Sequence, residues 1–212
     1  MLVVVGGHSR DIGKTSVVAG LIRALPQANW TAMKITQFGH GVCSASGHDC
    51  DCCLAPEHPY AIARESRTGD SDTGRFLAAG ARESYWVRTA TGGLELAVPA
   101  IREILAASQN LIIESNSIMQ FLEPQLYLVV LDFGKDDFKT SSRHFLERAD
   151  ACVVTDRGIR EPLWKGVPRE LFETKPRFPV RPPQYVTAAL SAFVAERLAA
   201  AGACTAPGPV CP

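Results

Sequence analysis

Hydrophobic positions along the chain fall into short continuous runs that alternate with stretches of helical spacing. Apolar runs of about four to eight residues predict buried strands, and apolar residues three or four apart predict helices that cover them. The predicted strands span residues 2–5, 30–35, 84–88, 111–114, 126–132 and 151–155. The predicted helices span residues 15–25, 70–81, 94–107, about 142–148 and 184–201. This alternation indicates the α/β class: a doubly wound, mostly parallel sheet, with a C-terminal helix.

Three segments interrupt the alternation. Residues 37–60 are rich in Gly, Ser, Asp, Cys and His without an apolar period, so we expect a loop insertion there. Residues 157–183 are expected to be irregular surface chain, because they contain six prolines. Residues 202–212 form a Pro-, Gly- and Ala-rich tail that we expect to be flexible. The remainder, residues 1–201, is expected to form a single domain with both interruptions inside it.

Composition and charge exclude several classes of protein. The chain has 212 residues, of which 46% are hydrophobic and 21% charged, and 22 basic side chains balance 22 acidic ones. This is the composition of an ordinary globular protein, not of a disordered or collagen-like chain. Zero net charge argues against a nucleic-acid platform. The apolar runs are too short to span a bilayer and no leader precedes the first strand, so we expect no membrane partner and a cytoplasmic location.

The most specific motif lies between the first predicted strand and the first predicted helix. Its residues are Gly7, His8, Ser9, Arg10, Asp11, Ile12, Gly13, Lys14, Thr15 and Ser16. A glycine turn in this position directs backbone N–H groups and a helix N-terminus at one anion, as in the P-loop that binds nucleotide phosphates. Lys14 is placed to reach the β- and γ-phosphates, and the Thr15 hydroxyl to bind Mg²⁺. The alternative is an ordinary glycine turn in which Gly-Lys-Thr occurs by chance.

The spacing of this motif carries a resemblance to known enzymes. Five residues separate Gly7 from Gly13, one more than in the common form. The loop resembles those of dethiobiotin synthetase and cobyric acid synthase, in which a Gly-x5-Gly-Lys-Thr/Ser turn follows the first strand. These enzymes belong to the same broad class of P-loop proteins as the signal-recognition GTPases and the MinD-type ATPases. The resemblance implies a P-loop NTPase fold, and proteins of this class are often homodimers.

Further segments are similar to the molybdopterin-guanine dinucleotide biosynthesis protein B family. They are AMKIT at 32–36, SDTGR at 71–75, AGA at 79–81, NLIIES at 110–115 and ADACVVTD at 149–156. The similarity covers about residues 1–156. Two features depart from the family: a cysteine cluster replaces its His-rich stretch after the second strand, and its Glu-Gly becomes Glu114-Ser115-Asn116.

Two carboxylates are candidate ligands of the Mg²⁺ that accompanies a nucleotide. Glu114 ends an apolar strand that we expect beside the first strand, so its carboxylate should emerge near the phosphates and the Thr15 hydroxyl. An ordinary strand-terminal acid is the alternative. The family resemblance implies Asp72 as a second ligand, and the alternative for Asp72 is the N-cap of a helix.

Other polar residues of these segments are candidates for catalysis or base recognition. Lys34 ends an otherwise buried strand and is a candidate catalytic residue beside Lys14, or else an edge lysine that extends to solvent. Asp11 either positions a water molecule or caps the turn. Asp156 follows a late strand. It either accepts a hydrogen bond from the nucleotide base or forms the turn that ends this strand.

Four cysteines, Cys43, Cys50, Cys52 and Cys53, lie within eleven residues. Disulfides are rare in a reducing compartment, so this density indicates metal ligands. Four thiolates suit tetrahedral Zn²⁺ or an iron–sulfur cluster, although the spacing fits neither a paired Cys-x2-Cys knuckle nor a ferredoxin run. A histidine could complete the set, the candidates being His40, His48 and His58. The alternative is that these cysteines are incidental.

These patterns predict an Mg²⁺-dependent protein that binds ATP or GTP, hydrolyses it slowly and carries Zn²⁺ or an iron–sulfur cluster. The family resemblance implies an adaptor or energy-coupling role in metal-cofactor assembly, with a cofactor-assembly or metalloenzyme client. Two alternatives remain open. One is an ATP-dependent ligase or kinase for a small carboxylate, as the dethiobiotin synthetase resemblance implies. The other is a non-catalytic nucleotide-binding module that holds the metal.

Overall fold

The computed structural model describes residues 1–38 and 60–204, and their side chains as far as residue 201. Within these residues, the strands are β1 (Leu2–Gly7), β2 (Trp30–Phe38), β3 (Tyr60–Arg64), β4 (Glu83–Ala90), β5 (Asn110–Glu114), β6 (Leu126–Asp132), β7 (Ala151–Thr155) and β8 (Arg177–Val180). The helices are α1 (Lys14–Ala24), α2 (Asp72–Ala78), α3 (Leu94–Ala107), α4 (Thr140–Phe145), α5 (Glu170–Glu173) and α6 (Ala188–Cys204).

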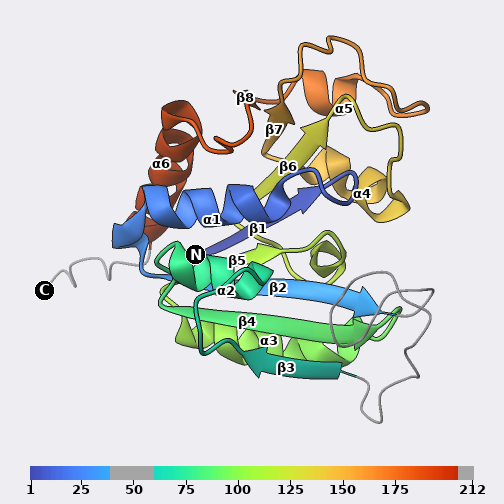
Figure 1. Cartoon of the computed structure of the whole chain (residues 1–212). Coiled ribbons are helices and arrows are strands. Elements are labelled where there is room, and N and C mark those ends of the chain that lie inside the picture. Colours follow the sequence, from blue (N-terminus) through green and yellow to red (C-terminus); the bar gives the residue numbers. More distant parts are fainter. Residues whose placement is uncertain (39–59, 205–212) are drawn as a thin grey trace, which may run out of the picture.

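All of these strands belong to one sheet, in the order β3-β4-β2-β5-β1-β6-β7-β8 (Figure 1). Every neighbouring pair is parallel except β3 and β4, which are antiparallel. The predicted α/β sheet, mostly parallel, is therefore confirmed. β1 lies between β5 and β6, with Val5 opposite Glu114, so the predicted proximity of Glu114 to the first strand is also confirmed.

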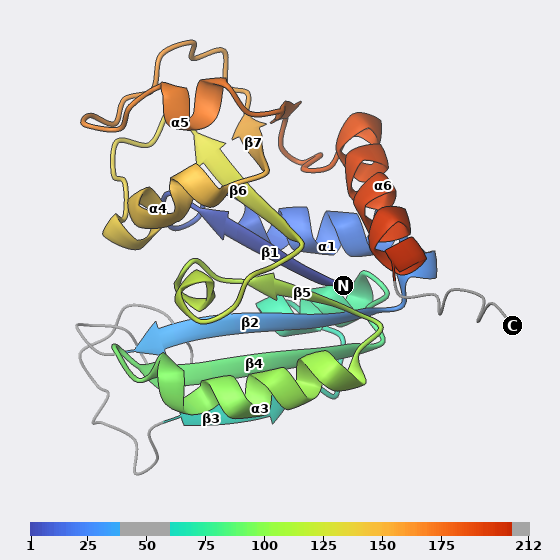
Figure 2. The ribbon, with the colours of Figure 1, turned by 180° about the vertical axis from the view of Figure 1, so that it is seen from behind.

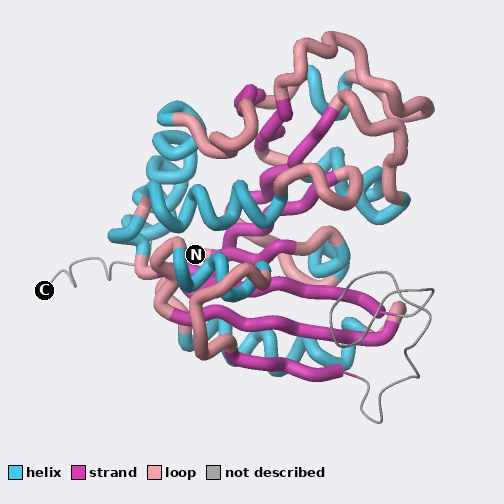
Figure 3. Tube along the Cα trace, viewed as in Figure 1, coloured by secondary structure: helices cyan, strands magenta, loops and turns pink. Residues whose placement is uncertain are grey.

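Helices cover both faces of the sheet. α1, α2 and α6 lie on the face seen in Figure 1, and α3 and α4 lie on the opposite face, seen in Figure 2; Figure 3 shows the strands between these two helical layers. The alternation of side chains along β1 divides the core accordingly. Val3 and Val5 pack on the α1 side, and Leu2 and Val4 pack on the α3 side. Because both faces of β1 are buried, its sequence reads as a continuous apolar run.

The prediction that residues 157–183 are irregular is wrong in part. This segment contains α5 and β8, and β8 pairs with β7 in parallel. Pro179 within β8 hides the strand in the sequence, because proline lacks the N–H that a central strand needs. At the edge of the sheet β8 has a neighbour on one side only, so that the proline is tolerated there.

The predicted loop insertion is shorter than residues 37–60. β2 continues to Phe38 and β3 begins at Tyr60, so both ends of the segment are strand. β3 was not predicted, because its sequence YAIAR is short and most of its side chains are exposed. The cysteine cluster, formed by Cys43, Cys50, Cys52 and Cys53, lies outside the described residues.

The C-terminal helix is confirmed with shifted ends. It begins at Ala188 rather than at residue 184, and it runs to Cys204, so the tail predicted to be flexible from residue 202 loses its first three residues to the helix. Residues 205–212 lie outside the described part of the chain. No helix in the described ranges has the length and apolar character needed to cross a membrane.

Candidate nucleotide-binding site

The carboxyl ends of β1, β2 and β5 open into a cavity of about 900 Å³. From the predicted P-loop, its lining includes Arg10, Asp11, Gly13, Lys14, Thr15 and Ser16. From the predicted metal and catalytic residues, it includes Lys34, Asp72 and Glu114. Residues from four separate segments thus meet where ligands bind in open α/β sheets, beyond the carboxyl ends of the strands.

The backbone of the predicted P-loop turns sharply between β1 and α1. Asp11 and Gly13 have positive φ angles of 53° and 93°, in the left-handed region. Residues with a side chain rarely adopt this backbone conformation, whereas glycine, as at Gly13, adopts it without a steric cost. Ile12 between them is buried in the core on the α1 side and anchors the loop. The packing of Ile12 in the core therefore fixes the shape of the loop, while Asp11 remains exposed at the cavity.

The Lys14 ammonium lies within the curve of this loop. Its Nζ donates a hydrogen bond to the carbonyl oxygen of Ser9 at 2.6 Å. Burial lowers the pKa of Lys14, and the nearby Glu114 carboxylate only partly offsets that effect. An anion bound at the loop would supply the missing negative charge and favour the protonated lysine.

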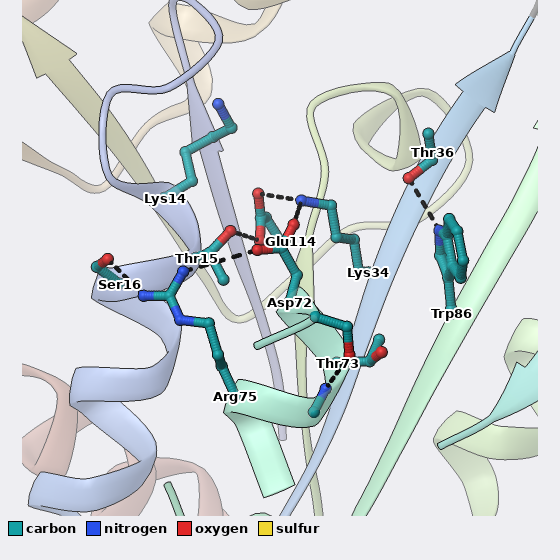
Figure 4. A network of polar contacts seen from close by, with 12 residues as sticks. Lys14, Thr15, Ser16, Lys34, Thr36, Asp72, Thr73, Arg75, Trp86 and Glu114 are labelled. Carbon is teal, nitrogen blue, oxygen red and sulfur yellow. Dashed lines mark hydrogen bonds and ion pairs between the residues drawn. The ribbon is translucent and has the colours of Figure 1, made fainter. Parts of the chain in front are cut away.

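A network of charged groups joins the start of α1 to β2, β5 and α2 (Figure 4). Thr15 Oγ1 donates to Glu114 Oε2 at 2.8 Å, and Lys34 Nζ lies 3.3 Å from Glu114 Oε1. Lys34 also donates to the Asp72 carboxylate. Burial by itself would lower the pKa of Lys34, but the Glu114 and Asp72 carboxylates outweigh it and raise that pKa. The Lys34 ammonium is therefore firmly protonated between two carboxylates.

The donor atoms of this network fit a magnesium–nucleotide site. Mg²⁺ prefers oxygen ligands, and in nucleotide sites it takes one or two from the protein and others from phosphates and water. The Thr15 hydroxyl and the Glu114 carboxylate are already in contact, with Asp72 on the far side of Lys34. Among the described residues, no group of three or more His, Cys, Asp or Glu side chains could hold a metal ion. Ligands from phosphate and water would therefore have to complete the coordination of Mg²⁺.

α2 supplies a second cation to the network. Arg75 Nη2 donates to Ser16 Oγ at 2.9 Å, and Arg75 Nη1 lies 3.7 Å from Asp72 Oδ1 (Figure 4). The N-cap of α2 is Ser71, whose Oγ accepts from the backbone N–H of Gly74, so the N-cap role considered for Asp72 is wrong. Arg75 was not among the predicted site residues, although it follows Asp72 by three residues and so lies on the same side of the helix.

Asn116, which the sequence analysis did not select, holds the start of the loop. Its Oδ1 accepts from the Gly7 N–H and its Nδ2 donates to the Gly7 carbonyl, both at 2.8 Å. A Cβ atom at Gly6 would clash with the same amide. The position of Asn116, two residues after Glu114 at the end of β5, was the available signal.

The His8 ring faces away from the cavity. Its Nδ1 lies 2.8 Å from the Asp137 carbonyl oxygen, and its Nε2 accepts from the Asp132 N–H at 3.0 Å. These two bonds require a neutral ring with its proton on Nδ1. The ring is fully buried against Phe138 and Trp164. The side chain of His8, which the sequence assigned to nucleotide binding, thus belongs to the support of the loop.

Two other predicted residues also have protein partners. Ser9 Oγ donates to the Asp137 carboxylate at 2.6 and 2.7 Å. Asp156 accepts from the Gly158 N–H, pairs with Arg181 and is not among the described residues that line the cavity. The Gly158 bond and then Arg181 lower the pKa of Asp156. In this structure Asp156 therefore forms a turn directly after β7, which is the alternative role that its position allowed.

Comparison with solved structures identifies the fold. HypB from Helicobacter pylori, determined in complex with nickel, is 15% identical and superposes with a TM-score of 0.52 over 94% of this chain and 87% of that one. LpxK from Aquifex aeolicus, determined in complex with ATP, is 18% identical, with a TM-score of 0.47 over 84% of this chain and 53% of that one. No protein-family model and no curated protein matches the sequence. The likeness to HypB shows that the chain has a P-loop NTPase fold.

Replacing Gly13 by alanine should destabilise the protein more than the same change at Gly80. Both glycines have positive φ, so each variant should lose about 1–2 kcal/mol to backbone strain. A Cβ at Gly13 would also clash with the Tyr185 ring, whereas nothing lies within 4 Å of one at Gly80. Chemical denaturation of the two variants measures the difference. Equal losses of unfolding free energy in the two variants would contradict this account. So would an extra loss from Gly13→Ala that persists when Tyr185 is also replaced by alanine.

The buried neutral His8 should make folding sensitive to mild acid. Burial lowers the pKa of His8, so between its ordinary value of about 6.5 and the lower folded value the unfolded chain binds a proton that the folded chain does not. The free energy of unfolding should consequently fall as the pH drops below about 6.5. In His8→Gln this part of the slope should vanish, and in His144→Gln, at an exposed site, it should remain. The free energy of unfolding is measured by denaturation at several pH values. If it depended on pH in the same way in wild type and in His8→Gln, the proposed effect of His8 would be ruled out.

Proposed function

We propose that this protein binds an Mg²⁺–nucleoside triphosphate in the 900 Å³ cavity and hydrolyses it slowly. The observation that supports this best is the Thr15–Glu114 hydrogen bond beside Lys14, because a P-loop hydroxyl and a strand-end carboxylate are oxygen donors suited to a nucleotide-bound magnesium ion. The P-loop NTPase fold supports the same proposal.

In the proposed reaction each residue has a distinct task. Loop amides other than those of Gly7 and His8, together with the Lys14 ammonium, bind the phosphates, and Glu114 keeps the Thr15 hydroxyl oriented. Mg²⁺, when bound, neutralises charge on the phosphoryl group that is transferred. Lys34 holds a positive charge in the middle of β2, opposite the end of β5, where it is placed to stabilise negative charge on the terminal phosphate. Asp11, exposed on the loop, is proposed to position the attacking water molecule.

Recognition of the nucleotide base and the cellular role of the protein are proposed on other grounds. Asp156 stays a candidate for base recognition only if it leaves Arg181 on nucleotide binding. The similarity to the molybdopterin-guanine dinucleotide biosynthesis protein B family supports an adaptor role in metal-cofactor assembly. The fold it shares with a protein determined in complex with nickel is compatible with that role. We further propose that a metalloenzyme or cofactor-assembly protein is the client and that the protein acts as a homodimer.

A second candidate function is phosphoryl transfer to a small carboxylate. The cavity continues past Lys34 to Thr36 and Gln37 in the last third of β2 and to Trp86 in the middle of β4. Trp86 Nε1 donates to Thr36 Oγ1 at 3.0 Å, which fixes a flat wall beyond the expected phosphate position. A cosubstrate of a ligase or kinase would need such a space next to the γ-phosphate.

The Lys14→Ala variant should bind nucleotide more weakly than wild type. Nucleotide binding by the Glu114→Gln variant should no longer depend on magnesium. Removal of the lysine eliminates a charge-assisted bond and should weaken ATP or GTP binding about 10- to 100-fold. Calorimetry with and without Mg²⁺, together with phosphate release, measures both effects, and Lys165→Ala on the exposed surface is the control.

Unchanged affinity in Lys14→Ala would contradict the proposed site. Binding without phosphate release in wild type would instead favour the non-catalytic module. Release that small carboxylates stimulate would favour the ligase or kinase.

The cysteine cluster is proposed to hold Zn²⁺ or an iron–sulfur cluster, with a histidine among the ligands where needed. Protein purified anaerobically without chelator should contain zinc or iron by elemental analysis, and a brown colour would identify iron–sulfur. A Cys50→Ser/Cys52→Ser variant should lose that metal, because its thiolate ligands are removed. Cys211→Ser, outside the cluster, serves as the control. Equal metal content in the double variant and wild type would refute the proposal.

A further inference from the structure

The segment between β6 and α4, residues 133–139, is bonded to the P-loop at several points. The Asp137 carbonyl contacts the His8 ring, and the Asp137 carboxylate accepts from Ser9 Oγ. The Lys139 N–H donates to the His8 carbonyl at 2.8 Å. At the start of the segment, the Asp132 N–H donates to His8 Nε2. These bonds fix the segment against the first half of the loop.

The Lys139 side chain is directed from this segment into the nucleotide cavity. It is partly buried and belongs to the cavity lining together with Lys14 and Thr15. No carboxylate of the described residues lies within ion-pair distance of its ammonium group, whereas Lys34 contacts both Asp72 and Glu114. A cation held inside a cavity in this way calls for an anion that the described residues do not supply.

The charges around Lys139 are mainly positive. Burial first, and then the positive charges of Lys14 and Arg10, lower its pKa to about 8, and the carboxylates of Asp137 and Asp11 only partly compensate. A lysine at an ordinary solvated surface keeps a pKa near 10.4. The surroundings of Lys139 therefore resemble an anion site before the anion has bound.

We infer that Lys139 is a further phosphate-binding lysine beside Lys14 and Lys34, which contacts the terminal phosphates of the nucleotide from the β6 side of the P-loop. β1 has β5 on one side and β6 on the other, so Glu114 and Lys139 approach the loop from opposite sides. The metal and its carboxylate would then lie on one flank of the phosphates, and the Lys139 ammonium on the other. This inference rests on the proposed function, since it names a further contact of the same nucleotide.

The inference is tested with Lys139→Gln, Lys139→Arg and the exposed control Lys165→Gln. The affinities of these variants for nucleoside tri-, di- and monophosphates are measured by calorimetry with Mg²⁺. Lys139→Gln should bind the triphosphate about 10- to 100-fold more weakly and the monophosphate nearly as wild type does, because one charge-assisted contact to a terminal phosphate is lost. Lys139→Arg should keep most of the affinity.

The loop itself should survive these substitutions, because the backbone of Lys139, and not its side chain, bonds to His8. Equal melting temperatures without nucleotide would verify that. If wild-type protein bound no nucleotide, the proposed function would fail and this inference with it. If wild type bound the triphosphate and Lys139→Gln bound it equally well, the inference alone would be overturned.

The pH dependence of binding gives a second readout. Phosphate favours the charged lysine and so raises its pKa in the complex, which means that the contribution of Lys139 is complete below pH about 8 and declines as the pH rises through the value in the complex. Arginine stays protonated throughout this range. Triphosphate affinity above pH 8 should therefore fall more steeply in wild type than in Lys139→Arg. Parallel profiles would contradict the inference, and the influence of Lys14 cancels because both proteins contain it.

Discussion

The Glu114 carboxylate is the group on which the arrangement of the cavity depends. One of its oxygens accepts from Thr15 at the start of α1, and the other faces the Lys34 ammonium from the middle of β2. Glu114 is only 5% exposed, so an unpaired charge there would be costly. Its partners come from both neighbours of β5 in the sheet, β1 through α1 and β2 directly. The pairing of β5 between those strands therefore determines where the hydroxyl, the carboxylate and the lysine meet.

The P-loop is held in place by polar contacts on either side of β1. Asn116, after β5, pairs with both backbone groups of Gly7, and the segment after β6 bonds to His8 and Ser9. A loop that presents its amides to a ligand cannot use them to stabilise itself, so its support has to come from such neighbours. The neutral His8 ring is the most demanding of these supports, because it must keep one donor and one acceptor while buried among aromatic side chains.

The sequence predicted the parts of this structure that depend on local pattern. Continuous apolar runs indicated the buried strands, and the Gly7–Ser16 motif between strand and helix indicated the loop. Edge strand β8 could not be found in this way, because it is only four residues long and contains Pro179. Asn116, Arg75 and Lys139 were missed for a different reason: their importance comes from where the fold places them, beside the P-loop or the cavity that segments far apart in the chain form together.

The charges of the cavity divide it into two regions, and this division explains which ligand it suits. The acidic groups, Glu114 and Asp72, are already balanced by the Lys34 ammonium. Lys14 points away from them in Figure 4, and both Lys14 and Lys139 have lowered pKa values because burial is not matched by negative charge. Partly buried cations without a nearby negative charge cost stability, and proteins retain such costs mainly where function needs them. In the proposed complex, a polyphosphate would relieve the excess positive charge beside Lys14 and Lys139. A divalent cation would take the place of the Lys34 charge beside Glu114, so that the phosphates and the metal would each match one region of the cavity.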